Sequence, residues 1–283
     1  MEKKNEINEI HIHNDINHIN TRALKEVDLN VFFTICAMFK DTDQLSVKIP
    51  FDRFIELTGI QKSTLNTRKK FIDFADKKTK KLRDLEYYNK TSSSFKVYHL
   101  IEGIEVPEDG DYLEIFITKK FSDGLKDYSG NFTEFFLQAI VNAQGKYAKN
   151  LYHLLMQYDD TGYATFKLDE FTGCMGVPES YRPKDIKTKV IEPAIRILKD
   201  KKLFEEITFE INKAHRQGNE ITGFDFHFTV AATDEMTGQQ KFNIGTKNEL
   251  SYQNQYKPKQ NSFKNYQQTN YIDSELEKRL LDN

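Results

Sequence analysis

Three patterns in the sequence predict an α+β protein built from two similar domains in tandem. Residues 146–231 read, in order, as an amphipathic helix, a short strand, two helices and two strands, and residues 28–118 show a related order. The segment 46–60 also aligns with 165–177 if two residues are skipped. Helix, strand, helix, helix, hairpin is the order of a winged helix-turn-helix. We therefore expect two tandem winged helix-turn-helix domains with a disordered C-terminal tail.

Size and composition limit the class of protein. The 283 residues suit two domains of about 100 to 150 residues each. The two cysteines, Cys36 and Cys174, lie in apolar helical patterns and offer neither a disulfide framework nor a zinc site. Because no apolar run approaches the ~20 residues of a membrane span and the start of the chain is polar, we expect a cytoplasmic protein without a membrane partner. A net charge of −2 still permits a locally positive surface for DNA.

The first domain is expected over residues 21–135, after a flexible arm or an edge strand at residues 1–20. Asp28 can cap a helix with so many apolar positions that it suits the centre of a domain. A strand at 46–49 and a short helix from Pro50 to Gly59 follow, with proline at the start of this helix and glycine at its end.

The longest helix of this domain is strongly basic. Ser63 can cap it, and the stretch from Lys62 to Arg83 carries nine basic and two acidic residues, a formal charge of +7. Such a stripe suits DNA phosphates, although a solvated helix face is the alternative. Ile72 is expected on the buried side with Phe71 and Ala75. The outward candidates for DNA contact are Ser63, Asn66, Thr67, Lys69, Lys70 and Lys77.

Two strands, at 95–104 and 112–118, are expected next, and the acidic turn between them at 107–111 could form a wing. The second domain is then expected over residues 136–231 as the main DNA-reading domain. Its first helix, from Lys146 to Tyr158, has apolar residues along one stripe.

The second domain continues in the winged-helix order. Gly162 can end its first helix, residues 163–168 read as a strand, and residues 169–176 read as a brief helix. Two strands at 203–212 and 221–231 complete it. Pro183 suits the first turn of the remaining helix, because the N–H that proline lacks would have no intrahelical partner there.

This last helix has a mixed, basic outward face. The stretch from Arg182 to Lys202 holds eight basic and three acidic residues, a charge of +5, while Ile186 and Val190 would point inward. Pro193 should bend the helix. Arg and Lys can reach guanine edges and Asp can accept from cytosine, so the set is compatible with base readout. The candidates for DNA contact are Tyr181, Arg182, Lys184, Asp185, Lys187, Thr188 and Lys189.

The second half resembles a known family, the Rep_3-type initiator proteins of theta-replicating, iteron-containing plasmids. The resemblance rests on Lys146-Tyr-Ala-Lys-Asn-Leu-Tyr-His-Leu-Leu155, Gly162, Val177-Pro-Glu-Ser-Tyr181 and Val190-Ile-Glu-Pro-Ala-Ile195, in that order, and covers residues 140–231. It implies binding to double-stranded DNA at repeated plasmid origin sequences. It also implies recruitment of the host replication initiator and replicative helicase, and a homodimer that represses its own gene.

Two other function classes stay open. A winged-helix transcriptional regulator would use the same DNA-binding parts. His11-Ile-His13 spells the His-hydrophobic-His motif of HUH-type origin-nicking rolling-circle initiators, in which alternate histidines on one strand bind a metal. The sequence has no Gly-Lys-Ser/Thr phosphate loop and no evident carboxylate cluster. We therefore expect a protein that is not an enzyme, without catalytic residues, cofactor or metal, in which His11 and His13 are dispensable.

The tail, residues 232–283, is of low complexity. Residues 232–270 contain 13 Asn plus Gln among 39 positions and few aliphatic side chains, so this part cannot bury a core. Beyond it, Ile272, Leu276 and Leu280 form a weak amphipathic pattern that suits a short terminal helix.

Overall fold

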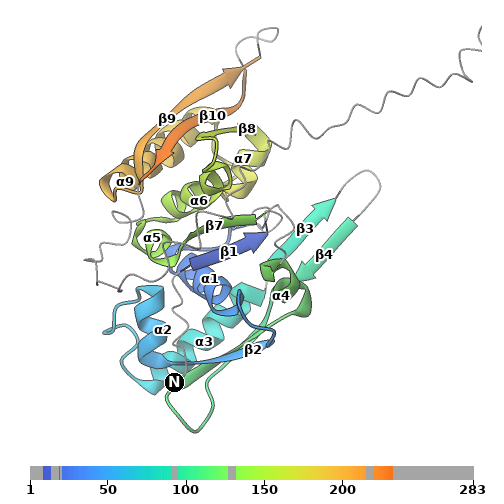
Figure 1. The fold of residues 1–283 in the computed structure, drawn as a ribbon, viewed down its shortest axis with the longest axis vertical. Coiled ribbons are helices and arrows are strands. Elements are labelled where there is room, and N and C mark those ends of the chain that lie inside the picture. Colours follow the sequence, from blue (N-terminus) through green and yellow to red (C-terminus); the bar gives the residue numbers. More distant parts are fainter. Residues whose placement is uncertain are drawn as a thin grey trace, which may run out of the picture. The chain divides into compact units, whose positions relative to one another are not determined.

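The computed structural model describes residues 9–13, 19, 21–83, 85–90, 95–126, 132–214 and 220–231. The tail and its terminal helix lie outside the described residues. Two winged helix-turn-helix units follow each other along the described chain (Figure 1). The first consists of α1 (Glu26–Phe39), β2 (Ser46–Pro50), α2 (Phe51–Thr58), α3 (Arg68–Arg83), β5 (Ile101–Glu105) and β6 (Tyr112–Ile117).

The second unit repeats this order. It consists of α6 (Lys146–Leu155) with the 3₁₀ turn η2 (Met156–Tyr158), β8 (Tyr163–Lys167), α7 (Leu168–Cys174), the helical run α8 (Pro183–Asp185), η3 (Ile186–Ile191) and α9 (Glu192–Asp200), and the strands β9 (Phe204–Lys213) and β10 (Ile221–Val230). The helices and strands expected for this half are therefore confirmed, with boundaries shifted by one or two residues.

The two units share one sheet topology. The strand orders are β2-β6-β5 in the first and β8-β10-β9 in the second, all antiparallel, so in each the last strand lies between the other two. In both, the first strand of the sheet leads directly into a short helix, β2 into α2 and β8 into α7. The repeat inferred from the sequence is thus a repeat of structure.

Each of these short helices is followed by a position that only glycine can occupy without strain. Gly59 and Gly176 have φ of 64° and 59°, the left-handed region in which a side chain strains the backbone. A Cβ on Gly59 would lie 2.6 Å from Val141 Cγ1, and one on Gly176 would lie 2.9 Å from the Arg22 backbone nitrogen. The next residue, Ile60 or Val177, is buried in both units.

Within the described residues, four strands and two helices lie outside this common order: β1 at the N-terminal end, β3 and β4 between α3 and β5, and the rest between the two units. They are β1 (Glu9–His13), β3 (Glu86–Lys90), β4 (Phe95–His99), α4 (Lys119–Lys126), β7 (Phe132–Phe136) and α5 (Leu137–Asn142). Strand β1 pairs antiparallel with β7 (Figure 1). Its Ile10 and Ile12 are buried. Residues 9–13 therefore follow the edge-strand alternative and not the flexible arm.

The strand expected at 95–104 is in fact two strands. Its middle residue, Leu100, is buried, and its backbone bonds both Leu85 and Thr118, so the chain changes partners there. β4 pairs with β3, which the sequence patterns did not reveal, whereas β5 pairs with β6 in the sheet of the first unit.

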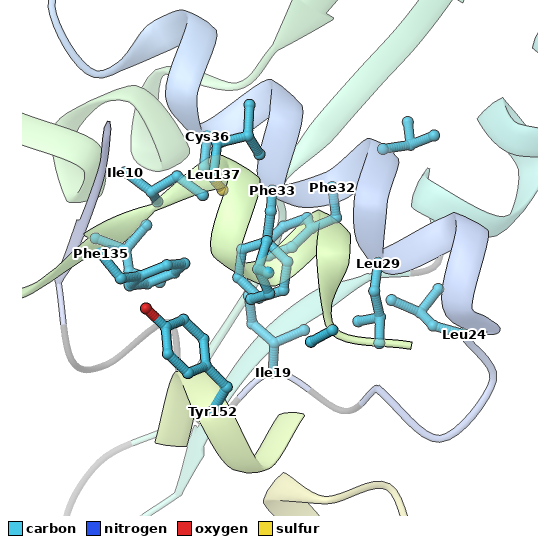
Figure 2. Packing of buried hydrophobic residues seen from close by; sticks show 14 of the residues in the cluster. Ile10, Ile19, Leu24, Leu29, Phe32, Phe33, Cys36, Phe135, Leu137 and Tyr152 are labelled. Atoms are coloured by element: carbon cyan, nitrogen blue, oxygen red, sulfur yellow. The ribbon is translucent and has the colours of Figure 1, made fainter. Parts of the chain in front are cut away.

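Helix α1 forms the centre of the core. Every residue from Asp28 to Phe39 is buried, and Figure 2 shows Leu29, Phe32 and Phe33 of this helix among residues from β1, β7 and α6. Asp28 does not occupy the N-cap position expected for it. The N-cap residue is Lys25, and Asp28 sits three residues later, where its carboxylate accepts the Lys25 backbone N–H at 2.9 Å.

Helix α6 buries polar as well as apolar side chains. Lys149 has a fully buried side chain, and its ammonium donates to the carbonyls of Ile140 (2.6 Å) and Val141 (3.0 Å) near the end of α5. Burial lowers the Lys149 pKa to about 8, although Glu26 at 3.9 Å opposes the shift. These bonds satisfy carbonyls in the last turn of α5, where the helix itself supplies no N–H donor.

His153 of α6 lies between two aromatic rings of the core. Its ring centroid is 5.1 Å from that of Phe33 and 5.3 Å from that of Phe135, and among the described residues its Nε2 has no hydrogen-bond partner. Burial lowers the His153 pKa from its usual 6.5 to about 3. The folded protein therefore holds this ring neutral where the unfolded chain would protonate it.

We predict that His153 makes the fold sensitive to mild acid. Because its folded pKa is depressed, the free energy of unfolding should fall as pH drops below about 6.5, by up to about 1.4 kcal/mol per pH unit. His153→Phe should flatten the profile between pH 6.5 and about 4.5 in urea titrations, before the carboxylates titrate. His227→Phe, which replaces an exposed histidine, should not. Equal slopes for the wild type and His153→Phe would contradict the assignment.

Candidate DNA interface

The basic helix α3 begins later than the sequence suggests. Ser63 lies in a turn before the helix, and Thr67 takes the N-cap role, because its Oγ1 accepts the Lys70 N–H (3.4 Å) and its carbonyl accepts the Phe71 N–H (3.2 Å). The Ser63 carbonyl instead accepts from Lys70 Nζ at 3.1 Å. The cap expected at Ser63 is therefore wrong.

The buried side of α3 also differs from the expected one. Phe71, Ala75 and Leu82 are buried as expected, but Ile72 is 48% exposed, and Phe74 packs against the core in its place. Positions 71, 74, 75, 78 and 82 follow the 3.6-residue period of one face, whereas position 72 is turned about 100° from position 71. Ile72 thus lies on the solvent side among charged residues.

Asp28 draws two of the lysines of α3 inward. Its side chain is fully buried and accepts from Lys78, and its second oxygen accepts from Lys81 at 2.9 Å. Burial by itself would raise the Asp28 pKa, but the bonds from Lys78, the Lys25 N–H and Lys81 outweigh it and hold that pKa below its usual range. The two ion pairs join α3 to α1 and engage both ammonium groups within the fold.

Five of the nine basic residues from Lys62 to Arg83 pair with carboxylates. Besides Lys78 and Lys81, they are Lys62 with Asp52, Arg68 with Asp111 and Lys80 with Asp76. Among the described residues, the remaining four have no carboxylate partner. These four residues are all exposed: Lys69, Lys70, Lys77 and Arg83. The expected candidates Lys69, Lys70 and Lys77 are thus three of these four exposed cations, and the expected candidates Ser63, Asn66 and Thr67 are exposed as well.

The turn between β5 and β6 is held against the start of α3. Arg68 donates to the Gly110 carbonyl at 2.6 Å and lies 3.9 Å from Asp111. The turn itself carries exposed Glu108, Asp109 and Asp111, so this wing is acidic at its tip. Phosphate contact in the first unit is therefore better suited to α3 than to its wing.

The third helix of the second unit changes its winding before Pro193. It begins at Pro183, passes through the π-helical segment η3, and returns to α-helix at Glu192. In an uninterrupted α-helix the Pro193 ring would clash with the Lys189 carbonyl and leave it without a donor. The extra residue in the wider turn of this π-helical segment removes the conflict, and the bend expected at Pro193 stays a prediction.

The residues expected to read DNA on this helix divide into two groups. Arg182, Lys184, Thr188 and Lys189 are exposed, whereas Tyr181, Asp185 and Lys187 are half-buried. The exposed Thr188 already donates to the Lys184 carbonyl at 3.0 Å. Ile186 and Val190 are buried, as expected for the inward side, and Ile191 is buried with them.

The Asp185 carboxylate is already bonded to residues of its own helix. One of its oxygens accepts the Arg182 N–H at 3.1 Å, and the other lies 2.7 Å from Lys189 Nζ. The bonds from Lys189 and the Arg182 N–H lower the Asp185 pKa, and the same contact raises the Lys189 pKa. Lys189 Nζ also lies 5.1 Å from the Tyr181 ring centroid, and Lys187 lies 3.7 Å from Glu192. Within the described chain, Arg182 and Lys184 are thus the basic candidates on this helix without a carboxylate partner.

The histidine motif gives no metal site that the structure describes. His11 and His13 lie on β1, but their side chains lie outside the description. Among the described side chains, no group of three or more His, Cys, Asp and Glu is placed to hold a metal ion. No helix in the described part of the chain is long and apolar enough to cross a membrane.

We predict that Asp28 is a major support of α3. Asp28→Asn leaves Lys78 and Lys81 facing a buried site without a charge partner, and the free energy of unfolding should fall by about 3 kcal/mol. This is the lower end of the usual cost, because Lys81 is 39% exposed and can turn to water. Asp76→Asn, which breaks the exposed pair with Lys80, is the matched control and should cost about 0.5 kcal/mol. Equal costs in urea unfolding would refute the role of burial.

Comparison with known proteins gives a consistent result. The chain is 27% identical over 168 residues to the "Probable replication protein rep" of Bifidobacterium longum (strain NCC 2705), an alignment that covers 58% of this chain and 56% of that relative. It therefore spans little more than half the length of this relative. A crystal structure of the Pi initiator protein in complex with iteron DNA matches with a TM-score of 0.62 and 18% identity, over 81% of this chain and 100% of that one. At this identity the match shows a common fold.

Two family profiles cover most of the described chain. Residues 9–156 match the profile described as "Initiator Replication protein, WH1", and residues 167–228 match "Initiator Rep protein, WH2". Together they span β1 and most of both winged-helix units, with α6 under the first profile and most of β8 in the gap between the two. The chain belongs to the family of initiator replication proteins.

Proposed function

We propose that this chain initiates plasmid replication by binding directly repeated sequences, iterons, at the plasmid origin. The observation that carries the proposal is the repetition of one DNA-binding architecture within a chain of the initiator family. Each unit presents its third helix with exposed cations that lack a carboxylate partner among the described residues, Lys69, Lys70 and Lys77 on α3 and Arg182 and Lys184 at α8. The Pi protein, which has the same fold, was crystallised with iteron DNA.

The two helices are suited to different parts of DNA. On α3 the unpaired cations are mainly lysines, which act as point charges and suit phosphates. At α8 an arginine and a lysine stand beside Thr188, Tyr181 and the Asp185–Lys189 pair, a mixed set that suits base edges. Arg182 can bond two guanine acceptors at once. Reading of sequence is therefore assigned to the second unit and anchoring to the first.

Replacing cations on the two helices should separate these roles. Arg182→Ala should cost about 1 to 3 kcal/mol on the cognate repeat and much less on scrambled DNA, and Lys184→Ala and Lys189→Ala should act in the same direction. Lys70→Ala with Lys77→Ala should weaken both DNAs about equally and lower the salt slope by about one unit per lost phosphate contact.

The measurement is a competition titration of each variant on both duplexes across a salt series. Lys80→Ala is the control on α3, because Lys80 is already paired with Asp76 and should leave the slope nearly unchanged. If the Lys70 and Lys77 variant loses specificity while Arg182→Ala only loses affinity, the reading helix belongs to the other unit.

An initiator and a plain regulator differ in what bound DNA does next. We propose that the bound chain brings in the host replication initiator and the replicative helicase, and that a homodimer represses the chain's own gene. A plasmid that carries only the repeats and an adjacent A+T-rich segment should then be maintained when the chain is supplied from elsewhere in the cell. Arg182→Ala together with Lys184→Ala should abolish maintenance. Binding and repression without maintenance would favour the regulator.

The third class, a nicking enzyme, predicts covalent chemistry. We propose that the chain acts without it, so supercoiled origin DNA incubated with the chain and Mg²⁺ or Mn²⁺ should stay uncut. His11→Ala with His13→Ala should leave plasmid maintenance unchanged. Cutting by the wild type that the double variant lacks would establish the nicking reaction instead.

A further inference from the structure

A short segment before α1 contacts the turn that leads into the reading helix of the second unit. We call the contact the clasp, and it consists of Thr21, Arg22, Lys146, Asn150 and Gly176. The Asn150 amide is 4% exposed and donates to both Thr21 Oγ1 (2.9 Å) and the Met175 carbonyl (3.1 Å). One side chain of α6 thus ties the N-terminal segment to the end of α7.

Further bonds of the clasp hold the same turn. Thr21 Oγ1 donates to the Cys174 carbonyl at 3.3 Å, and Lys146 Nζ donates to the carbonyls of Arg22 (2.9 Å) and Gly176 (3.1 Å). Burial, and then the charge of Arg22, lower the Lys146 pKa. Arg22 also pairs with Glu179 at 2.5 Å in an exposed position, which contributes little by itself.

The fit at Gly176 shows how closely the segment approaches the turn. A Cβ there would lie 2.9 Å from the Arg22 nitrogen, Lys146 Nζ and Thr21 Oγ1, so a side chain would force the clasp apart. From Gly176 the chain passes through Val177 to Tyr181 and enters α8 at Pro183. The clasp therefore fixes the backbone just before the reading helix.

The same segment also reaches the other basic helix. Seven residues after Thr21, the buried carboxylate of Asp28 holds Lys78 and Lys81 of α3. Residues 22–28 run through a turn into the first turn of α1, so the chain between the two contacts is short and ordered. Thr21 and Asp28 thus link the entry of one DNA-facing helix to the body of the other.

We propose that the clasp sets the spacing between the two DNA-facing helices and so makes Thr21 and Asn150 positioning residues for recognition of the repeat. They touch no base. They determine how far apart the two contacted parts of a DNA site can lie if both helices are to bind at once. This inference rests on the proposed function, because it takes α3 and the α8–α9 helix as the two contacts on one repeat.

The test changes the DNA and the clasp together. Footprinting of wild type on its cognate repeat first locates the two contacted parts of the site. Duplexes with one or two base pairs inserted between those parts then move one part by about a tenth or a fifth of a helical turn. Wild type should bind the inserted duplexes at least about tenfold more weakly than the cognate repeat, the scale of a well-placed mismatch.

Loosening the clasp should reduce this discrimination. Thr21→Val with Asn150→Ala should bring the ratio of affinities below about threefold, with a smaller change in affinity for the cognate repeat. Thr21→Ser keeps the hydroxyl and should keep the wild-type ratio. Thr118→Val is the matched control, because it also removes a threonine hydroxyl, one that bonds the His99 carbonyl and the Phe121 N–H and lies outside the clasp.

Each outcome decides between the claims. If wild type binds no repeat DNA in preference to scrambled DNA, the proposed function fails. If wild type discriminates and the double variant does so equally, or loses affinity for all duplexes by one factor, the clasp has only a structural role and the inference is overturned. Circular dichroism and thermal melting of each variant identify any loss of folded protein, and a variant that fails to fold is replaced by Thr21→Val alone, read in the same way.

Discussion

The buried carboxylate of Asp28 determines which charges the first unit can offer to DNA. It lies on the central helix α1, and it bonds Lys78 and Lys81 of α3. A buried charge without partners is very unfavourable, so these lysines must stay with it. Under the proposed function, the +7 stretch would therefore contact DNA through far fewer cations than its formal charge suggests. Among the described residues, Lys69, Lys70, Lys77 and Arg83 remain exposed and without a carboxylate partner.

The second unit uses the same architecture with a different distribution of charge. Its third helix, to which the proposed function assigns sequence reading, keeps Asp185 at the first turn, where it accepts the Arg182 N–H and pairs with Lys189. The start of the helix is thereby ordered before any DNA arrives, which lowers the conformational cost of binding. The π-bulge before Pro193 lets the helix continue past a residue that would otherwise end it.

Much of the fold could be predicted from the sequence because local rules specify it. Alternating strands, glycine at helix ends and proline at helix starts located β2, β8, α2 and the start of α8 correctly. The site could be predicted only in part. The face on which Ile72 lies depends on where α3 begins, and the lysines taken up by Asp28 depend on packing between distant elements. An acidic residue next to the apolar run of α1 was the available signal for Asp28, while Thr21 gave none.

The central claim is that both third helices contact one repeat. A DNA-cleaving iron chelate can be attached to a cysteine placed at Lys70 or at Lys184, with Cys36 and Cys174 replaced by alanine. On an end-labelled repeat, the two positions should give two separate clusters of cleavage at fixed sites along the duplex. Cleavage from only one of the two positions, or cleavage spread evenly along the DNA, would contradict the account.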